Sequence, residues 1–497
     1  MTWIVCDGFT KFGIRQERPE RPSGENEAQH MSNTAAHGGS YVAGSDDDNA
    51  VVWKERARIP LNFVADSVQA SVDHYSKERI VTNSAVPATA ANAAARGDAS
   101  PAPERGVRLN RPATLEDWAR LNVVDDWSQP APARWAYRHV RELVPTARVA
   151  RGDQPAPLPR AETSEQLPGI AELMQGETTD GLLVLHNGTV VFEEYAHGMR
   201  VDDTHIVNSV TKSLVGTLAG VLVERGALTP EDEVVKYVPE LAGTSYEGAS
   251  VRHLLDMRTG TSVENKGIGY TPDVDYWEEW GAQFDWTPGT PSDQDAIAFI
   301  ASFINAREHG GPFEYRSILT DLLGLVLERA ADSSLAELLG QELWAPMGAE
   351  WDADLAVNRH GFAPACAGIS TTLRDLARFG QLMLDNGTVD GRQIVPAAWI
   401  EDTFHGGLDS AAAFAGSKYE QYFPSGQYRN QWWVPAPGRV LLGLGSGGQH
   451  LYVDRAAGVS IAHVSTMSSQ AAKKQRVASI GALRSIADHL SVSAPRI

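Results

Sequence analysis

The sequence predicts a mixed α/β (α+β) fold in which one antiparallel sheet, made from segments far apart in the chain, is flanked by helices. Two observations carry this prediction. Residues 182–192 read as two strands joined by Asn187-Gly188, a dipeptide typical of a tight hairpin turn. Residues 449–453 and 459–464 read as a second strand pair around Gly458, and the stretch between the two pairs is largely helical and loop-rich.

Composition excludes several classes of protein. The 497 residues include 43 basic and 63 acidic side chains, a net charge of −20, which disfavours nucleic acid or an anionic membrane as a partner. The two cysteines, Cys6 and Cys366, are too far apart in sequence for a disulfide framework or a zinc cluster, and Cys366 is expected to be a buried apolar residue. With no secretion signal and no apolar run long enough to span a bilayer, we expect a soluble, cytoplasmic protein.

The chain divides into an extension and a large domain. Residues 1–105 are of low complexity and are predicted to be mostly disordered, with one short helix over 62–77. Order is expected to begin near Thr114, where a capping residue precedes an acid by three positions. We therefore place the domain at 106–497.

The helices follow from apolar spacing and from capping residues. A long loop with Tyr270 and three tryptophans interrupts them, and loops of that length inside domains are usually functional. The expected helices are residues 134–140, ended by Pro145; 251–257, ended by Gly260; one from Ser317 onward; one opened by Thr372 and ended at Asn386-Gly387; and 471–490.

The stretch from Asn208 to Gly220 contains the candidate nucleophile. It contains the Ser-x-x-Lys pattern of Ser209 and Lys212 at the start of a predicted helix, where residues three apart share a face. The lysine amine can lie beside the serine hydroxyl, and the unpaired N–H groups of the first helical turn favour developing negative charge. A serine that only caps a helix gives the same local pattern, so the pattern by itself does not distinguish a nucleophile from a cap.

Two further segments could complete such a site. Tyr315 lies just before a predicted helix, and a phenol near an ammonium can relay a proton; it could equally be a core aromatic residue. The glycine-rich run around Ser446, Gly447 and Gly448 leads into a strand at Gln449, where a backbone N–H could face an oxyanion. A tight turn explains the same glycines.

In their order along the chain, Ser209-x-x-Lys212, Tyr315-x-Ser317 and Ser446-Gly447-Gly448 resemble the three motifs of the serine β-lactamase and penicillin-binding-protein superfamily. Within it, the chain is most similar to the linear 6-aminohexanoate-dimer hydrolases, a class-C-like branch that also contains carboxylesterases. The resemblance covers about residues 114–490. It includes Trp135-Ala136-Tyr137, residues 237–243, Leu255-Asp256-Met257, residues 375–378 and Gln431-Trp432-Trp433.

This resemblance implies a β-lactamase-like sheet with flanking helices and an inserted all-helical subdomain, roughly residues 215–375. It implies that Ser209 is acylated, that Lys212 and Tyr315 act as the general base and acid pair, and that backbone N–H groups of Ser209 and Gln449 form the oxyanion hole. Tyr270 resembles the aromatic residue that hydrogen-bonds the scissile amide nitrogen in amide-cleaving members.

The sequence departs from the superfamily pattern at two places. Ser317 replaces the frequent Asn of the second motif, and Ser446-Gly447-Gly448 replaces Lys-Thr-Gly, which removes a cation that would hold a substrate carboxylate. A small amide or ester substrate therefore fits better than a β-lactam.

The predicted function is a serine hydrolase for a small amide, similar to the 6-aminohexanoate dimer, working through an acyl-enzyme. A carboxylesterase and a non-catalytic binding or sensor module on the same fold are the alternatives. No cofactor and no metal are expected, because the histidines show no ligand spacing; His450 is expected to be a satisfied surface residue. A small molecule is the expected partner, and a homodimer stays open.

Overall fold

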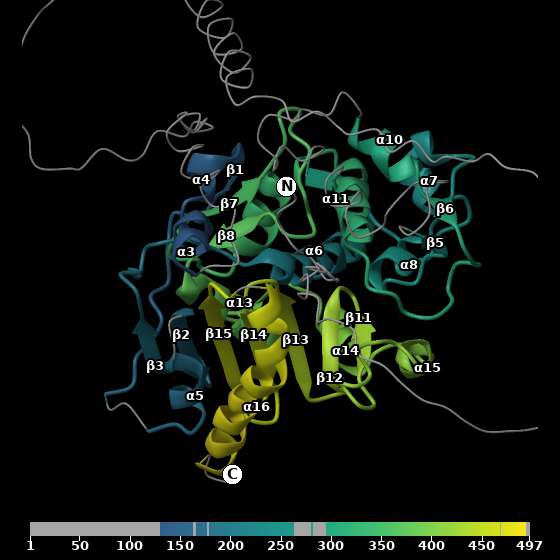
Figure 1. Cartoon of the computed structure of the whole chain (residues 1–497). Helices are drawn as coiled ribbons and strands as arrows, with labels where there is room; N and C mark the ends of the chain where they lie inside the picture. Colours follow the sequence, from purple (N-terminus) through teal and green to yellow (C-terminus); the bar gives the residue numbers. More distant parts are fainter. Residues whose placement is uncertain are drawn as a thin grey trace, which may run out of the picture. The chain divides into compact units, whose positions relative to one another are not determined.

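The computed structural model describes residues 130–162, 166–175, 178–262, 280–281, 295–467 and 469–493 (Figure 1). The predicted disordered extension over 1–105, the helix over 62–77 and the start of order near Thr114 lie outside the described residues. So does Tyr270, together with most of its loop.

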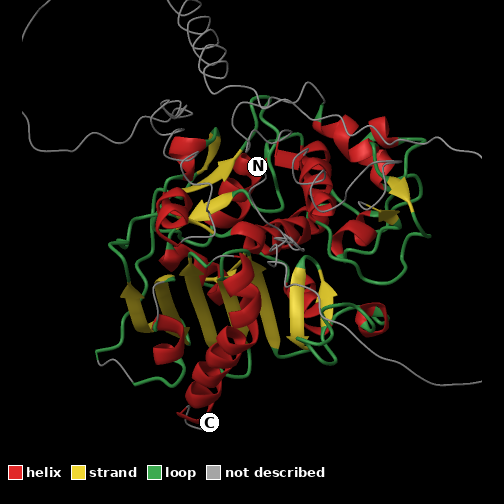
Figure 2. Cartoon of the chain, viewed as in Figure 1, coloured by secondary structure: helices red, strands yellow, loops and turns green. Residues whose placement is uncertain are grey.

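A seven-stranded antiparallel sheet forms one half of the described fold, as the sequence predicts (Figure 2). Its order is β11-β12-β13-β14-β15-β2-β3, so the C-terminal strands pair with the N-terminal hairpin at β15 and β2, where Ile461 lies opposite Val184. The strands are β2 (Thr179–His186), β3 (Thr189–Tyr195), β11 (Gln427–Arg429), β12 (Trp432–Ala436), β13 (Val440–Gly445), β14 (Gln449–Asp454) and β15 (Val459–Ser465).

The predicted turn between β2 and β3 is confirmed. Asn187 and Gly188 both have positive φ, 50° and 77°, the backbone that a two-residue hairpin turn requires and that Asn-Gly adopts at little cost. The N-terminal helix is confirmed with a break at His139, giving α3 (Pro130–Arg138) and α4 (Val140–Leu143).

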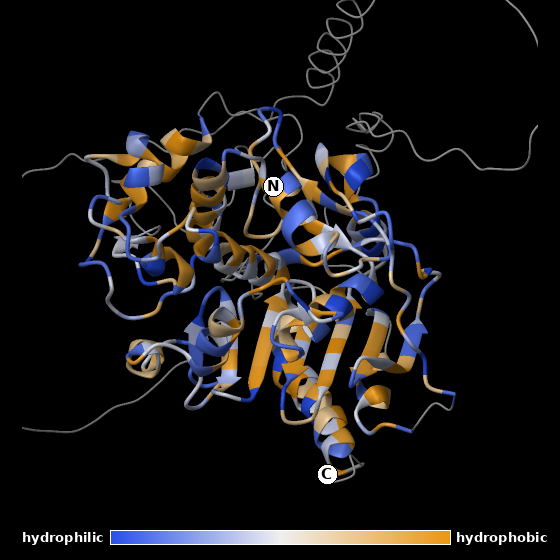
Figure 3. Ribbon diagram, turned by 180° about the vertical axis from the view of Figure 1, so that it is seen from behind, coloured by the Kyte–Doolittle hydropathy of each residue, from blue (hydrophilic) through white to orange (hydrophobic). Residues whose placement is uncertain are grey.

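Helices cover both faces of the large sheet. On one face α13 (Leu373–Leu384) packs on β14 and β15, and Gly380 lies so close that a Cβ would be 2.9 Å from Leu451. On the other face α16 (Ser469–Ser493) packs on β15 and on α5 (Ile170–Met174). Arg484 and Asp488 of α16 are near enough to Tyr452 of β14 for their charges to influence the pKa of its hydroxyl. The strands β14 and β15 between these layers are buried along their whole length. Figure 3 shows many hydrophobic residues along the strands of the large sheet.

A four-stranded antiparallel sheet, which the sequence did not suggest, lies in the order β1-β7-β8-β4. Its strands are short: β1 (Thr146–Val149), β7 (Ala353–Ala356), β8 (Ile369–Thr371) and β4 (His205–Ile206). Ile206 pairs with Ser370, so this sheet fixes the chain immediately before Asn208.

The other helices lie mainly between α6 (Thr211–Glu224) and α13 in sequence, and Figure 1 shows them gathered beyond α6 from the large sheet. The predicted helices at 251, 317, 372 and 471 are confirmed as α8, α11, α13 and α16. The remaining elements are α7 (Val234–Tyr237), η2 (Pro239–Leu241), α8 (Val251–Leu255), β5 (Thr261–Ser262), α10 (Ala296–Ala301), β6 (Ile304–Asn305), α11 (Ser317–Ala331), α12 (Leu335–Leu339), η3 (Gly340–Trp344), β9 (Thr388–Val389), β10 (Arg392–Gln393), α14 (Ala397–His405) and α15 (Ser410–Phe414).

Helix α6 runs through the centre of the described fold. Every residue from Thr211 to Leu222 is buried, so the helix packs on all sides. Two glycines one turn apart permit this: a Cβ on Gly216 would lie 2.0 Å from the Asn430 carbonyl, and one on Gly220 would lie 2.3 Å from the Trp399 ring. None of the helices in the described part of the chain has the length and apolar character needed to cross a membrane.

Candidate active site

Ser209 lies in the turn that leads into α6. It belongs to the 3₁₀ turn η1 (Asn208–Val210), and Lys212 follows in the first turn of α6. The Lys212 Nζ is 3.0 Å from Ser209 Oγ, and both residues are buried, 1% and 6% exposed. The i, i+3 spacing thus places an amine within hydrogen-bonding distance of an alcohol.

Lys212 also donates to two groups from distant segments. Its Nζ is 3.2 Å from Ser317 Oγ at the first residue of α11, and 2.9 Å from the carbonyl oxygen of Cys366 between β7 and β8. Cys366 is fully buried, as expected, but its contribution to the site is its backbone carbonyl, which side-chain reasoning missed. Burial and these acceptors hold the amine against Ser209.

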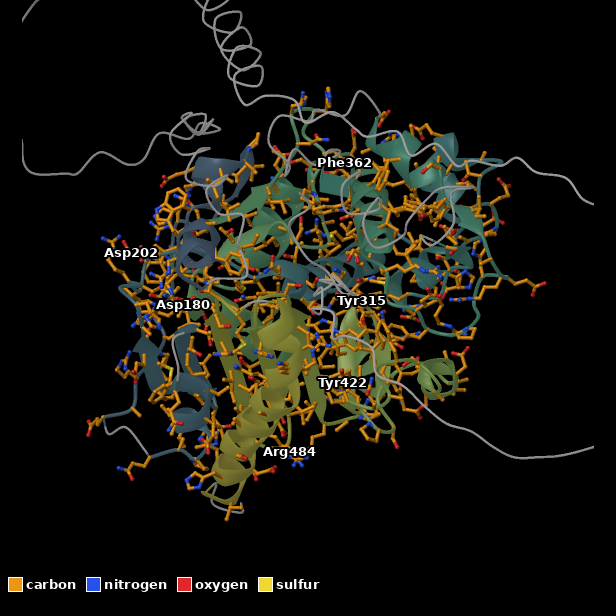
Figure 4. The ribbon with its side chains drawn as sticks, viewed as in Figure 1. Asp180, Asp202, Tyr315, Phe362, Tyr422 and Arg484 are labelled. Carbon is orange, nitrogen blue, oxygen red and sulfur yellow. The ribbon has the colours of Figure 1, made fainter. Side chains whose placement is uncertain are left out.

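Tyr315 lies beside the same amine. The Lys212 Nζ is 4.9 Å from the centroid of the Tyr315 ring, which is within the range of a cation–π interaction. The ring also stacks on Trp433 of β12, with ring centroids 5.1 Å apart and the planes 20° apart. Figure 4 labels Tyr315 where the helices around α6 meet the β11–β13 end of the large sheet.

The supporting role of Trp433 was not predicted, although the sequence Gln431-Trp432-Trp433 contributed to the resemblance. The ring of Trp433 also contacts Phe313, two residues before Tyr315, and four aromatic residues of α15, β11 and the chain between them: Phe414, Tyr419, Phe423 and Tyr428. Tandem tryptophans in a strand near a candidate site are a signal that could have found this support.

The third motif lies directly against the Ser209 turn. Ser446, Gly447 and Gly448 form the turn between β13 and β14, with φ of 76° and 86° at the two glycines. The Asn208 side chain donates from Nδ2 to the Ser446 carbonyl oxygen at 2.8 Å. The residue before the candidate nucleophile is thereby tied to the motif expected to hold the substrate.

Gln449 begins β14, and its side chain hydrogen-bonds to backbone groups, including the Ser446 carbonyl oxygen, to which Nε2 donates at 3.2 Å. Its Nε2 donates to the Ser465 carbonyl at 2.5 Å, and its Oε1 accepts from the Ser465 N–H at 3.1 Å, so the fully buried side chain links β14 to the end of β15. Any oxyanion contact by Gln449 would therefore come from its backbone N–H, as the resemblance implies.

A buried carboxyl group lies behind Lys212. Asp321 is fully buried on α11, one turn after Ser317. It accepts from the Cys366 N–H at 2.9 Å and from the Trp280 indole at 2.9 Å. Burial raises the pKa of Asp321 to about 6, against the opposing effects of these two hydrogen bonds and of the Lys212 charge.

The expectation for His450 is wrong. The residue is 4% exposed, and its Nδ1 is 3.0 Å from Nδ1 of His463 on the neighbouring strand. Burial holds the pKa of His450 well below its usual value, so the ring is neutral and structural. Within the described ranges, no three His, Cys, Asp or Glu side chains come together in a way that could hold a metal ion.

Comparison with known proteins assigns the chain to a family. The model of the β-lactamase family matches residues 160–482, so the chain belongs to that family and is a hydrolase of the serine type.

Within this family, the chain is similar to proteins named as 6-aminohexanoate-dimer hydrolases. The chain is 35% identical over 340 residues to the 6-aminohexanoate-dimer hydrolase of Paenarthrobacter ureafaciens, covering 67% of this chain and 85% of that protein. Among solved structures, the "Putative 6-aminohexanoate-dimer hydrolase from Bacillus anthracis" superposes with a TM-score of 0.65 at 26% identity, covering 73% of this chain and 96% of the other. The "putative beta-lactamase from Bacteroides dorei DSM 17855", at 19% identity and a TM-score of 0.51, covers 64% and 97% and shares the fold.

Proposed function

We propose that the protein is a serine hydrolase that cleaves a small amide, similar to the 6-aminohexanoate dimer, through an acyl-enzyme on Ser209. The observation that carries the proposal is the 3.0 Å approach of the buried Lys212 amine to Ser209 Oγ. An alcohol is a weak nucleophile until a neighbouring base takes its proton. The amine and the adjacent Tyr315 phenol supply that base.

The reaction begins when Ser209 Oγ attacks the amide carbonyl carbon and its proton passes to the Lys212–Tyr315 pair. The negative charge that develops on the carbonyl oxygen is stabilised by the backbone N–H groups of Ser209 and Gln449. The pair then gives the proton to the leaving nitrogen as the C–N bond breaks. Water next attacks the ester on Ser209, its proton passes through the same pair back to Oγ, and the acid is released.

The substrate class is inferred from the relative and from the third motif. The relative with 35% identity is named for hydrolysis of the 6-aminohexanoate dimer, whose two units are joined by an amide. The turn of Ser446, Gly447 and Gly448 carries no charged side chain, so it offers no cation to hold a substrate carboxylate. This disfavours a β-lactam whose carboxylate is held by a cation at this turn, and the amide class rests on the relative.

The proposal is tested on the purified full chain. A fluorophosphonate probe is expected to label wild-type protein at Ser209, and 6-aminohexanoate dimer is expected to be hydrolysed; Ser209→Ala should abolish both. Ser213→Ala is the matched control, because Ser213 lies on the same helix and its hydroxyl donates to the Gln431 carbonyl at 3.2 Å. Unlabelled wild-type protein, or turnover by Ser209→Ala, would refute the mechanism.

The same experiment separates the alternatives. Turnover of short p-nitrophenyl esters without turnover of amides would identify a carboxylesterase that uses the same residues. If Ser209 keeps one acyl group after incubation with an ester or an amide and never releases it, the protein is a binding or sensor module.

A further inference from the structure

The amine that is central to the proposed mechanism contacts the backbone of Cys366, and a buried acid contacts the same residue's backbone from the other end. The Cys366 carbonyl oxygen accepts from Lys212 Nζ at 2.9 Å. The N–H of the same residue donates to Asp321 Oδ1 at 2.9 Å. Lys212, the Cys366 residue and Asp321 therefore form a continuous chain of contacts from the site into the core.

Asp321 shares a helix face with a direct partner of the amine. Ser317 and Asp321 are four residues apart on α11, so their side chains project in the same direction. Ser317 Oγ is 3.2 Å from Lys212 Nζ, while Asp321 lies deeper and is fully buried. One helix thus supplies both a hydroxyl to the amine and a carboxylate behind it.

The second oxygen of Asp321 is held by Trp280, one of two described residues between 262 and 295. Trp280 donates its indole N–H to Oδ2 at 2.9 Å, and its own side chain is 1% exposed. With two donors fixed on two oxygens, the carboxylate has a single orientation. A buried carboxylate acts on a neighbouring cation more strongly than a solvated one does.

We propose that Asp321 is a positioning residue that fixes the backbone of Cys366 beside Lys212 and electrostatically stabilises the Lys212 ammonium. This deepens the proposed function and rests on it. When the Lys212–Tyr315 pair takes the proton of Ser209, positive charge forms on Lys212, and the carboxylate stabilises that charged state. Asp321 does not itself touch the reacting atoms.

Other ionisable groups around this cluster are few among the described residues. Tyr246, before α8, is fully buried, which raises the pKa of its hydroxyl. The charge of Arg316 lowers that pKa and the charge of Asp321 raises it. On the remaining helices packed against α11, the charged groups are otherwise engaged or exposed: Asp256 next to α8 pairs with Arg429, and Lys236 of α7 and Glu337 of α12 face solvent. Asp321 is thus the described carboxyl group that acts on Lys212 from this side.

The test is Asp321→Asn, which keeps the shape of the side chain and removes its charge. With lysine labelled by ¹³C at Cε, the Lys212 signal is titrated by NMR in wild type and variant. The pKa of Lys212 should fall by roughly 1 unit, since an adjacent opposite charge favours the ionised form. The acid limb of kcat/KM, governed by the Lys212–Tyr315 pair, should move to lower pH with it, and kcat should fall about tenfold or more.

Asp375→Asn is the matched control. Asp375 is also fully buried on a helix and accepts two backbone N–H groups, from Glu350 and Trp351 at 2.8 and 3.0 Å. Its substitution should reduce stability similarly and leave the Lys212 titration unmoved. If Asp321→Asn does not fold, Trp280→Phe removes one donor to the carboxylate and should move the titration in the same direction by less.

An unmoved Lys212 titration in the folded variant overturns the inference, whatever the protein hydrolyses. Absence of label on Ser209 in the wild type refutes the proposed function separately, because the NMR titration does not depend on turnover.

Discussion

Asn208 is bonded through its side chain to the backbone carbonyl of Ser446, at 2.8 Å, while its own backbone is left-handed with φ of 46°. This contact joins the turn before Ser209 to the turn that carries the third motif. Asparagine is one of the few residues that adopts this backbone readily while offering a donor. The positions of the nucleophile and of the expected oxyanion site are therefore mechanically linked.

Asn208→Gly should keep the backbone and break the link. Glycine adopts positive φ freely, so the loss is one hydrogen bond of about 1 kcal/mol. If that bond aligns Ser209 with the third motif, kcat/KM should fall about tenfold with little change in Tm. Asn187→Gly, in the exposed hairpin turn with φ of 50°, is the control and should leave kcat/KM unchanged. Equal rates in the two variants would show that the link does not matter for catalysis.

Tyr315→Phe should separate proton transfer from packing. The ring would keep its stacking on Trp433 at 5.1 Å, so Tm should change little. Loss of the hydroxyl from an acid–base pair should lower kcat by about 10²–10⁴-fold. Tyr452→Phe, at another buried tyrosine on β14, controls for loss of a buried hydroxyl and should retain full kcat. Activity of Tyr315→Phe near the wild-type level would remove Tyr315 from the mechanism.

Gly448→Ala should damage the third motif by steric overlap. A Cβ there would lie 2.4 Å from Ser465 Oγ and 2.9 Å from Met467 Sδ, and φ is 86°. We expect a loss of about 2–4 kcal/mol in urea unfolding, from overlap and left-handed strain together, and slower labelling of Ser209. Gly391→Ala has the same sign of φ, 76°, and no atom within 4 Å, so it should show strain alone. Matching losses in the two variants would contradict the steric argument.

His463 should make stability depend on pH. Burial lowers its pKa from 6.5 to about 4, and nearby His205 acts in the same direction against Asp180. Between these values the unfolded chain binds a proton that the folded chain does not, so this contribution is complete above pH 6.5 and is lost as pH falls towards 4. Asp321, with its pKa raised from 3.8 to about 6, makes the opposite contribution: between these pH values the folded chain binds the extra proton, so this contribution to stability grows as pH falls.

The His463 contribution is isolated by comparison with a variant. Tm measured from pH 7 to 4 should fall less steeply for His463→Gln than for the wild type, because the proton difference is gone while Asp321 is unchanged. His360→Gln, at an exposed histidine, should keep the wild-type slope. Parallel curves for His463→Gln and wild type would show that His463 does not titrate as described.

Local features were readable from the sequence because they depend on neighbours along the chain. The Asn187-Gly188 turn and the capping threonine of α13 each depend on a few adjacent residues. The 3.0 Å contact of Ser209 and Lys212 follows likewise from helical geometry, since residues three apart share a face. Strand pairs at both ends of the domain were enough to indicate the large sheet.

Contacts between distant segments were decided by packing alone. Cys366 is 154 residues from Lys212, and Ser446 is 238 residues from Asn208, so no local pattern announces that they meet. The prediction that His450 lies on the surface was wrong for the same reason. Its position in β14 indicates which face of the sheet it occupies, but only the tertiary structure shows that α16 covers this face. The sequence by itself determined which residues could react. The tertiary structure decided which backbone groups and buried charges surround them, because those are set by the close packing of α6, α11 and the two sheets.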